Sequence, residues 1–202
     1  MGTSVSETRF KTKDGREVEV RPPKLVDAAA MTAFVNQLAK EKKVNRDLGI
    51  ASFDSRATVA FERRWLRSII QATKRETAVT MVAFSSGKLV GECTLRRQER
   101  RDMRHTGVLG IVVLRDFRGV GLGKDLMKVV LRSARRMGVW LVELEVMAIN
   151  RAAIRLYKKV GFRAAGVIPG KILRDGRELD MVVMFADLRG TDKFPRRRRG
   201  KS

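Results

Sequence analysis

The alternation of apolar and polar residues along the chain predicts strands grouped into hairpins. Residues 8–21 alternate about Asp14-Gly15, a dipeptide typical of tight hairpin turns. A second pair of strands is expected at 77–85 and 88–96, joined at Ser86-Gly87. The nearly continuous apolar run at 106–114 predicts a strand in the middle of a sheet. Three more strands are expected, at 139–146, 163–167 and 179–186, the last two with a turn at Asp175-Gly176 between them.

Apolar residues at helical spacing predict four helices between these strands. They are expected at 25–39, 56–73, 121–137 and 150–160, and a polar connection is expected at 40–54. In the second helix, Val59, Trp65, Leu66 and Ile69 form the predicted buried face. The order of elements is β-β-α-α-β-β-β-α-β-α-β-β. This order predicts an α/β fold, a mixed sheet with helices packed against it.

The 202 residues suit one domain, which we expect over 8–188. Residues 1–7 are expected to be a flexible N-terminus, and 189–202 a disordered polybasic tail with four consecutive arginines. No stretch approaches the roughly 18 apolar residues that span a membrane. The N-terminus also lacks the apolar segment of a secretory signal. These features predict a cytoplasmic protein.

The charge balance is strongly basic and indicates a polyanionic partner. Lysine and arginine number 44 against 22 acidic residues, which gives a net charge of +22. Such a charge attracts nucleic acids, so RNA or the ribosome is an expected partner. Only three asparagines and three glutamines are present, a depletion that favours a thermophilic source. The basic residues cluster at 63–67, 96–104, 128–136 and 193–202.

The scarcity of cysteine and histidine excludes several kinds of site. Cys93 is the only cysteine, so the chain has no intramolecular disulfide and no cysteine-rich zinc site. His105 is the only histidine and has no second histidine for a metal triad or a catalytic pair. We expect no metal. His105 is expected to be an exposed loop residue, with substrate binding as the alternative.

A glycine-rich segment lies between a predicted strand and a predicted helix. Glycine lets the backbone approach a ligand closely, and the first N–H groups of a helix have no partners inside it. The spacing differs from the dinucleotide fingerprint, and Asp125 stands where a phosphate-binding P-loop needs Ser or Thr. The residues therefore predict an anion site, with a turn required only by chain geometry as the alternative. The segment comprises Arg118, Gly119, Val120, Gly121, Leu122, Gly123 and Lys124.

Two motifs together resemble those of the GNAT (Gcn5-related) N-acetyltransferase superfamily. Arg118-x-x-Gly121-x-Gly123 resembles its acetyl-CoA motif, R/Q-x-x-G-x-G/A. The segment from Asn150 to Phe162 resembles its element N-x-x-A-x-x-L-Y-x-x-x-G-F. The resemblance covers 106–162. It is closest to ribosomal-protein alanine and protein N-terminal acetyltransferases, and to small-amine and antibiotic acetyltransferases. It implies the GNAT acyl-CoA N-acyltransferase fold and acetyl-CoA as co-substrate. The family often has proline where this chain has Arg115.

The resemblance also implies how the cofactor is held. Backbone groups of Ile111, Val112 and Val113 would bind the pantetheine arm, and the backbone amides of 119–124 would bind the pyrophosphate. Asn150 would contact the cofactor near the pantetheine. An N-cap for the helix that it opens is the alternative role of Asn150.

The same resemblance implies the catalytic residues. Tyr157, the only tyrosine, is the candidate acid that protonates the departing thiolate, since phenols titrate near 10 and thiols near 8.5. A core aromatic is its alternative role. Glu145 is the candidate base, and Glu143 shares its strand face. Glu92 is a further candidate. Each acid would alternatively pair with an arginine, and a chain of waters would make a single base unnecessary.

The sequence thus predicts an N-acetyltransferase that acts on a primary amine of a protein, N-terminal or lysine, docked at RNA or the ribosome. The alternative is a ribosome- or RNA-associated binding protein on the same scaffold, with weak or lost catalysis. A small-amine acetyltransferase fits less well. A protein of net charge +22 repels polyamines and aminoglycosides unless its acceptor cleft is locally acidic.

Overall fold

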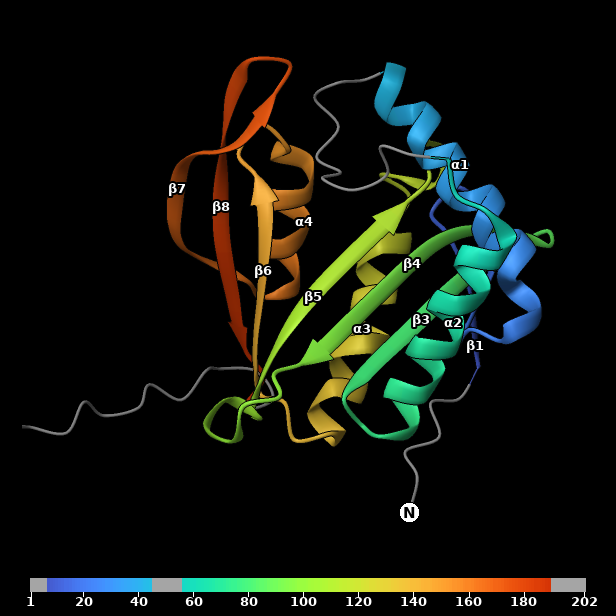
Figure 1. Ribbon diagram of the computed structural model, residues 1–202, viewed down its shortest axis with the longest axis horizontal. Helices are drawn as coiled ribbons and strands as arrows, with labels where there is room; N and C mark the ends of the chain where they lie inside the picture. The colour runs from blue at the N-terminus through green and yellow to red at the C-terminus, as the bar shows by residue number, and fades with distance from the viewer. Residues whose placement is uncertain (1–6, 45–55, 190–202) are drawn as a thin grey trace, which may run out of the picture.

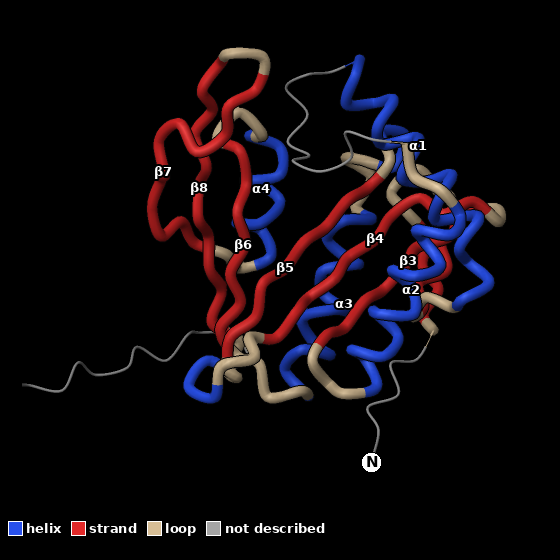
Figure 2. Tube along the Cα trace, viewed as in Figure 1, coloured by secondary structure: helices blue, strands red, loops and turns tan. Residues whose placement is uncertain are grey.

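A computed structural model describes residues 7–44 and 56–189. Over these residues, eight strands form one mixed sheet in the order β1-β2-β3-β4-β5-β6-β8-β7, and four helices pack against it (Figure 1; Figure 2). The predicted α/β architecture is confirmed. The predicted flexible N-terminus and polybasic tail lie outside the described residues, apart from residues 7 and 189.

The first five strands form an antiparallel run that begins with the predicted hairpin. Glycine at positive φ closes the first two turns, at Gly15 and Gly87, where side-chain-bearing residues are disfavoured. The strand predicted to be central is the fifth of eight, with Leu109 buried. These strands are β1 (Thr8–Lys11), β2 (Glu17–Arg21), β3 (Ala78–Ser85), β4 (Lys88–Arg97) and β5 (Thr106–Val113).

The helices cover both faces of the sheet. α1 (Ala28–Val44) and α2 (Val59–Lys74) lie on one face, and α3 (Leu122–Arg136) and α4 (Arg151–Val160) on the other (Figure 1). The prediction of a polar connection from residue 40 was wrong for 40–44, which continue α1 because lysine and glutamate are good helix formers. No helix in the described part of the chain is long and apolar enough to cross a bilayer.

The last three strands form the other side of the sheet. β6 (Leu141–Met147) and β7 (Arg163–Arg174) both pair with β8 (Arg177–Asp187). β7 runs well past the predicted end at residue 167. Its pairing is irregular at two places, after Ala164 and after Ile168, and most of its side chains are exposed. Pairing with β8 therefore forms this strand, because it has no alternating pattern of its own.

β5 and β6 are parallel neighbours that separate along their length. They pair at only three positions, Thr106–Val108 with Leu141–Glu143. Beyond these pairs β5 stays bonded to β4 as far as Val113, and β6 stays bonded to β8 as far as Met147. The two strands diverge clearly in Figure 1. We call this divergence the splay; its facing backbone groups are not paired with a strand.

Candidate active site

A cradle of unpaired backbone amides lies between β5 and α3. Gly119 and Gly121 have φ of 79° and 100°, and Gly121 is the N-cap of α3. No described residue accepts a hydrogen bond from the N–H groups of 119–123, whereas the N–H of Lys124 donates to the Gly121 carbonyl at 3.0 Å. We call 119–123 the glycine cradle. Its N–H groups and the start of α3 suit a pyrophosphate.

The third glycine of the cradle has a packing role. A Cβ at Gly123 would lie 3.1 Å from Leu156 Cδ2 of α4 and 3.7 Å from Ile111 Cδ1 of β5. The side chain of Leu156 would therefore have to shift to accommodate even an alanine at this position. Gly123 allows close packing, whereas Gly121 supplies a backbone conformation that other residues rarely adopt.

The β1–β2 turn touches the cradle, a contact that the sequence did not reveal. The N–H of Lys13 donates to the Val120 carbonyl at 2.9 Å, and Lys13 Cγ lies 3.8 Å from where a Cβ at Gly121 would be. A lysine here adds positive charge beside the amides. Because Lys13 is more than a hundred residues away along the chain, no local pattern pointed to it.

The side chain of Arg118 is bound within the protein. Its Nε donates to the Val113 carbonyl at 2.8 Å, and its Nη2 donates to Glu41 of α1 at 2.5 Å. Glu41 also accepts from the N–H of Arg115 at 3.0 Å. Arg118 therefore fixes the end of β5, and Glu41 is a structural partner that the sequence analysis missed.

The backbone of β5 presents alternate residues to the splay. The N–H of Leu114 donates to Val90 of the β4 side, at 2.9 Å. Because strand backbones alternate, Val112 also directs its backbone groups to β4, and those of Ile111 and Val113 face the splay. The predicted pantetheine contacts therefore have a position at Ile111 and Val113. The side chain of Val112 lines a cavity described below.

Asn150 has the geometry of an N-cap. Its Oδ1 accepts from the N–H of Ala153 at 3.1 Å at the start of α4. This is the alternative role considered for it. The structure places α4 and its cap beside the splay, so cofactor contact through the remaining amide N–H₂ stays a prediction.

Tyr157 lies on α4 with a buried ring. Its ring packs against Phe162, with 6.0 Å between centroids. Burial raises the pKa of its hydroxyl above the ordinary value, and nearby Cys93 raises it further. The phenol therefore stays protonated at neutral pH. Burial likewise raises the pKa of the Cys93 thiol.

Glu92 lies on the opposite face of β4 from Cys93, because neighbouring strand side chains alternate. The Thr94 hydroxyl donates to its carboxylate and shares a hydrogen bond of 2.7 Å with the hydroxyl of Thr80. Burial raises the pKa of Glu92 to about 7, although Thr94 and Arg96 oppose the shift. A carboxylate with this pKa is well matched to accepting a proton near neutral pH.

Glu92 lines a cavity of about 420 Å³ beneath α1 and α2. The floor consists of β4 and β5, next to the splay. The charged lining residues are Glu62, Glu92 and Arg96. The apolar lining includes Met31, Phe34, Phe61, Trp65, Val108 and Val112. We call this space the acceptor cavity.

Glu145, the predicted base, lies on β6 and outside that cavity. Its carboxylate is exposed and forms an ion pair of 2.5 Å with Lys171 of β7. Glu143 does not line the cavity either. The structure thus brings Glu92, rather than Glu145, next to the acceptor cavity. The base assignment to Glu145 did not account for Lys171, because β7 was not expected to reach it.

His105 lies at the closed end of the splay. Its ring stacks on Trp140 with 4.2 Å between centroids, and the guanidinium of Arg189 lies 3.6 Å from the centre of the same ring. The His105 carbonyl accepts hydrogen bonds from Trp140 and Leu141. His105 is not among the residues that line the acceptor cavity.

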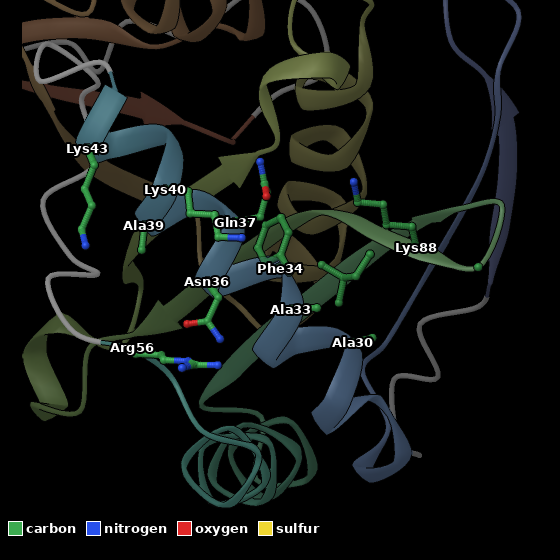
Figure 3. A pocket seen from close by; sticks show the side chains of 12 residues that line it. Ala30, Ala33, Phe34, Asn36, Gln37, Ala39, Lys40, Lys43, Arg56 and Lys88 are labelled. Atoms are coloured by element: carbon green, nitrogen blue, oxygen red, sulfur yellow. The ribbon is translucent and has the colours of Figure 1, made fainter.

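A larger hollow of about 850 Å³ lies beside α1 and the β3–β4 turn (Figure 3). Asn36 hydrogen-bonds both backbone groups of Ala57 there, which holds the start of the α2 segment against α1. None of the described lining residues is an acid or a tyrosine, so the hollow lacks a proton acceptor. Its charged lining comprises Lys40, Lys43, Arg56 and Lys88.

The described residues contain no group of three His, Cys, Asp or Glu side chains placed to hold a metal.

The splayed sheet, the glycine cradle and the motif at Asn150 define one family. Residues 46–162, more than half of the chain, match the Acetyltransferase (GNAT) family. The chain belongs to this family.

Individual relatives agree with this assignment. The L-amino acid N-acetyltransferase AaaT of Escherichia coli is 32% identical over 108 residues, 52% of this chain and 65% of that protein. The chain spans about half to two thirds of the length of such curated relatives.

Two solved structures share the fold. The structure of yncA from Salmonella typhimurium, with its cofactor acetyl-CoA, has a TM-score of 0.73 at 21% identity. The match covers 87% of this chain and 96% of the chain in that structure. A ribosomal-protein-alanine N-acetyltransferase from Brucella melitensis has a TM-score of 0.71 at 24% identity, with 84% of this chain and 99% of its own covered.

Proposed function

We propose that the protein is an acetyl-CoA-dependent N-acetyltransferase that acts on a primary amine. The observation that carries this proposal is the position of the glycine cradle at the splay. Five consecutive N–H groups, 119–123, are unpaired within the described chain, next to a strand whose backbone is free on one side. This arrangement suits a ligand with a pyrophosphate followed by a peptide-like arm, which is the chemistry of CoA.

The residues present fit that ligand. The cradle would hold the pyrophosphate, with Lys13 adding positive charge. Ile111, through its N–H and carbonyl, and Val113, through its N–H, would bind the pantetheine arm at the splay, since the Val113 carbonyl already accepts from Arg118. Asn150 would contact the same arm while capping α4. Bound acetyl-CoA supplies an acetyl thioester, and its sulfur leaves as a thiolate that requires one proton.

Glu92 and Tyr157 lie on opposite faces of the sheet and divide the proton transfers. Glu92 would accept the proton that an ammonium must lose before the amine can attack, directly or through a water in the acceptor cavity. Tyr157 would give its hydroxyl proton to the departing sulfur from the α4 side. The role of general base, predicted for Glu145, is assigned here to Glu92, because the Glu145 carboxylate is paired with Lys171.

The acceptor we propose is an amine of a protein. The acceptor cavity, of about 420 Å³, is large enough for the N-terminal residue of a polypeptide or a lysine side chain. Among relatives, AaaT is named for L-amino acids and the Brucella melitensis enzyme for ribosomal-protein alanine. A free amino acid is therefore the competing acceptor.

Calorimetry and a turnover assay test the proposal. Acetyl-CoA should bind, and Gly121→Trp, which fills the cradle, should abolish binding while circular dichroism shows a folded protein. Thiol release should then be measured with N-terminal peptides, lysine peptides and free amino acids. An absence of acetyl-CoA binding by the native protein would contradict the proposal.

A second candidate function is docking on RNA or the ribosome. His105, Trp140 and Arg189 form a stacked platform beside the 96–104 loop, in which Arg100, Arg101 and Arg104 are exposed. Stacked aromatic and guanidinium groups among arginines suit single-stranded RNA. Affinity for RNA should fall steeply with salt and after removal of 190–202. Salt-insensitive binding would count against it.

A further inference from the structure

A second carboxylate lies in the acceptor cavity and has no assigned role. Glu62 belongs to the first turn of α2, is 4% exposed and lines the cavity together with Glu92. No described residue forms a hydrogen bond or an ion pair with its side chain, although the chain has 44 lysines and arginines. Its carboxylate oxygens therefore open into the cavity, since no fully buried side-chain oxygen in the described residues lacks a hydrogen-bond partner. A carboxylate that is so little exposed and has no cation beside it is unusual, because desolvation disfavours its charge.

The position of Glu62 in α2 does not explain its burial. An acid in the first turn of a helix is favoured by the helix dipole, but that effect is smaller than the cost of desolvating a carboxylate. Thr58 already caps the helix by accepting from the N–H of Phe61. Burial also raises the pKa of Glu62, the sign expected of a carboxylate that lacks a cation.

The charged residues that line the acceptor cavity leave one negative charge without a balancing cation. Glu62, Glu92 and Arg96 are its charged lining residues, so its wall carries a net charge of −1 when all three are ionised. Arg96 is largely exposed, whereas Glu62 is buried. One cation would neutralise the wall. The rest of the lining includes Phe61 and Trp65, which favour an apolar body beside that cation.

We propose that Glu62 binds the ammonium group of the acceptor and selects acceptors that carry no carboxylate beside that group. This inference rests on the proposed acetyl transfer and names its substrate class, an apolar monocation such as the N-terminal residue of a polypeptide. A free amino acid adds a carboxylate next to its ammonium. That second negative charge meets the carboxylates of Glu62 and Glu92, and like charges repel.

The cavity is therefore locally acidic in a protein of net charge +22. This removes the objection that a cationic acceptor would be repelled. Arg96 offers a competing arrangement, in which it pairs with the carboxylate of a free amino acid. The two arrangements predict opposite preferences between leucine and leucinamide, which differ only in that carboxylate.

Calorimetry on the full chain saturated with CoA tests the proposal. We expect leucinamide to bind at least about 10-fold more tightly than leucine. Glu62→Gln should weaken leucinamide binding by about 10-fold or more and reduce the preference. Glu62→Asp, which keeps the charge, should restore part of the affinity. Glu99→Gln, at an exposed acid outside the cavity, is the matched control.

The melting temperature distinguishes a binding role of Glu62 from a structural one. The melting temperature of Glu62→Gln should be equal to or above that of the native protein at pH 8, because an unpaired buried charge is removed; a purely structural role would lower it. Equal leucinamide binding by the native protein and Glu62→Gln, no leucinamide binding by the native protein, or a preference for leucine would each overturn the proposal.

Thiol release with leucinamide and acetyl-CoA separates this inference from the proposed function. Glu62-dependent binding without turnover would support the cation site and overturn the acetyltransferase proposal. Turnover with the same kcat/KM in native protein and Glu62→Gln would do the reverse.

Discussion

Glu41 of α1 binds Arg118, the first residue of the acetyl-CoA motif, through an ion pair in which the Glu41 side chain is only 9% exposed. The same carboxylate accepts from the backbone of Arg115, and Arg118 holds the Val113 carbonyl. α1 also lines the acceptor cavity through Met31. The helix that covers the acceptor thus also fixes the strand end that precedes the glycine cradle.

Glu41→Gln should therefore weaken cofactor binding from a distance. The loss of the ion pair frees the end of β5, so the KM for acetyl-CoA should rise about 10-fold while kcat changes little. The free energy of unfolding should fall by about 1–3 kcal/mol. Steady-state kinetics and urea unfolding measure both effects, with Glu99→Gln as control. An unchanged KM would show that the link has no effect on the cradle.

The raised pKa of Glu92 predicts how activity depends on pH. A base must be deprotonated, so kcat/KM should fall as pH decreases through about 7. Glu92→Gln should lower kcat by roughly 10²- to 10⁴-fold. In Glu62→Gln the inflection should move to lower pH, because the Glu62 charge raises the pKa of Glu92. A profile that is flat between pH 6 and 8 would remove Glu92 from the base role.

The raised pKa of Glu92 also predicts that Glu92→Gln, which should lower activity, stabilises the folded protein. A carboxyl whose pKa is higher folded than unfolded destabilises the fold once pH exceeds its unfolded value, and the penalty is complete above the folded value. Glu92→Gln removes that penalty, so at pH 8 it should raise the free energy of unfolding by on the order of 2 kcal/mol. At pH 4 the two proteins should be alike. Urea unfolding at both pH values measures this.

Tyr157→Phe should affect turnover more than binding or folding. The ring and its contact with Phe162 remain, and only the buried hydroxyl is lost. We expect kcat to decrease by about 10²-fold with little change in the calorimetric affinity for acetyl-CoA. A mutant that turns over at the native rate would leave Tyr157 as a core aromatic.

Gly121→Ala should both strain the backbone and weaken the cradle. Its φ of 100° disfavours any Cβ, at a cost of about 1–2 kcal/mol. Gly166→Ala is the matched control, because Gly166 has no atom within 4 Å of an added Cβ and no positive φ. Thermal unfolding and acetyl-CoA calorimetry should show a loss only at position 121. Equal losses would mean that the cradle has no special conformation.

Local patterns predicted most elements because turns, caps and apolar periodicity act over a few residues. The hairpin at Asp14-Gly15 and the helix after Gly121 follow from such signals. β7 did not, because its strand depends on pairing with β8. Contacts between distant segments, such as Lys13 at Val120, have no local signal at all.

The candidate site shows the same division. The cradle and Tyr157 stand in motifs and were found. Glu92 was only a further candidate, because its importance comes from its place in the acceptor cavity. Glu62 did have a signal, since it falls four residues before Leu66 and seven before Ile69, on the predicted apolar face of α2. Both of these are buried, whereas Val59, also predicted to be buried, is exposed. A lone acid on such a face marks a buried charge.

The splay has a mechanical consequence for the whole sheet. β5 and β6 share three residue pairs at one end, so the sheet resembles two panels joined by a short hinge, one made of β1–β5 and the other of β6–β8. A pantetheine arm hydrogen-bonded to both strands would supply the hydrogen bonds that β5 and β6 lack and would limit movement of the two panels relative to each other. Amide exchange at Ile111 and Glu145, whose N–H groups face each other across the splay, should then slow together when acetyl-CoA binds.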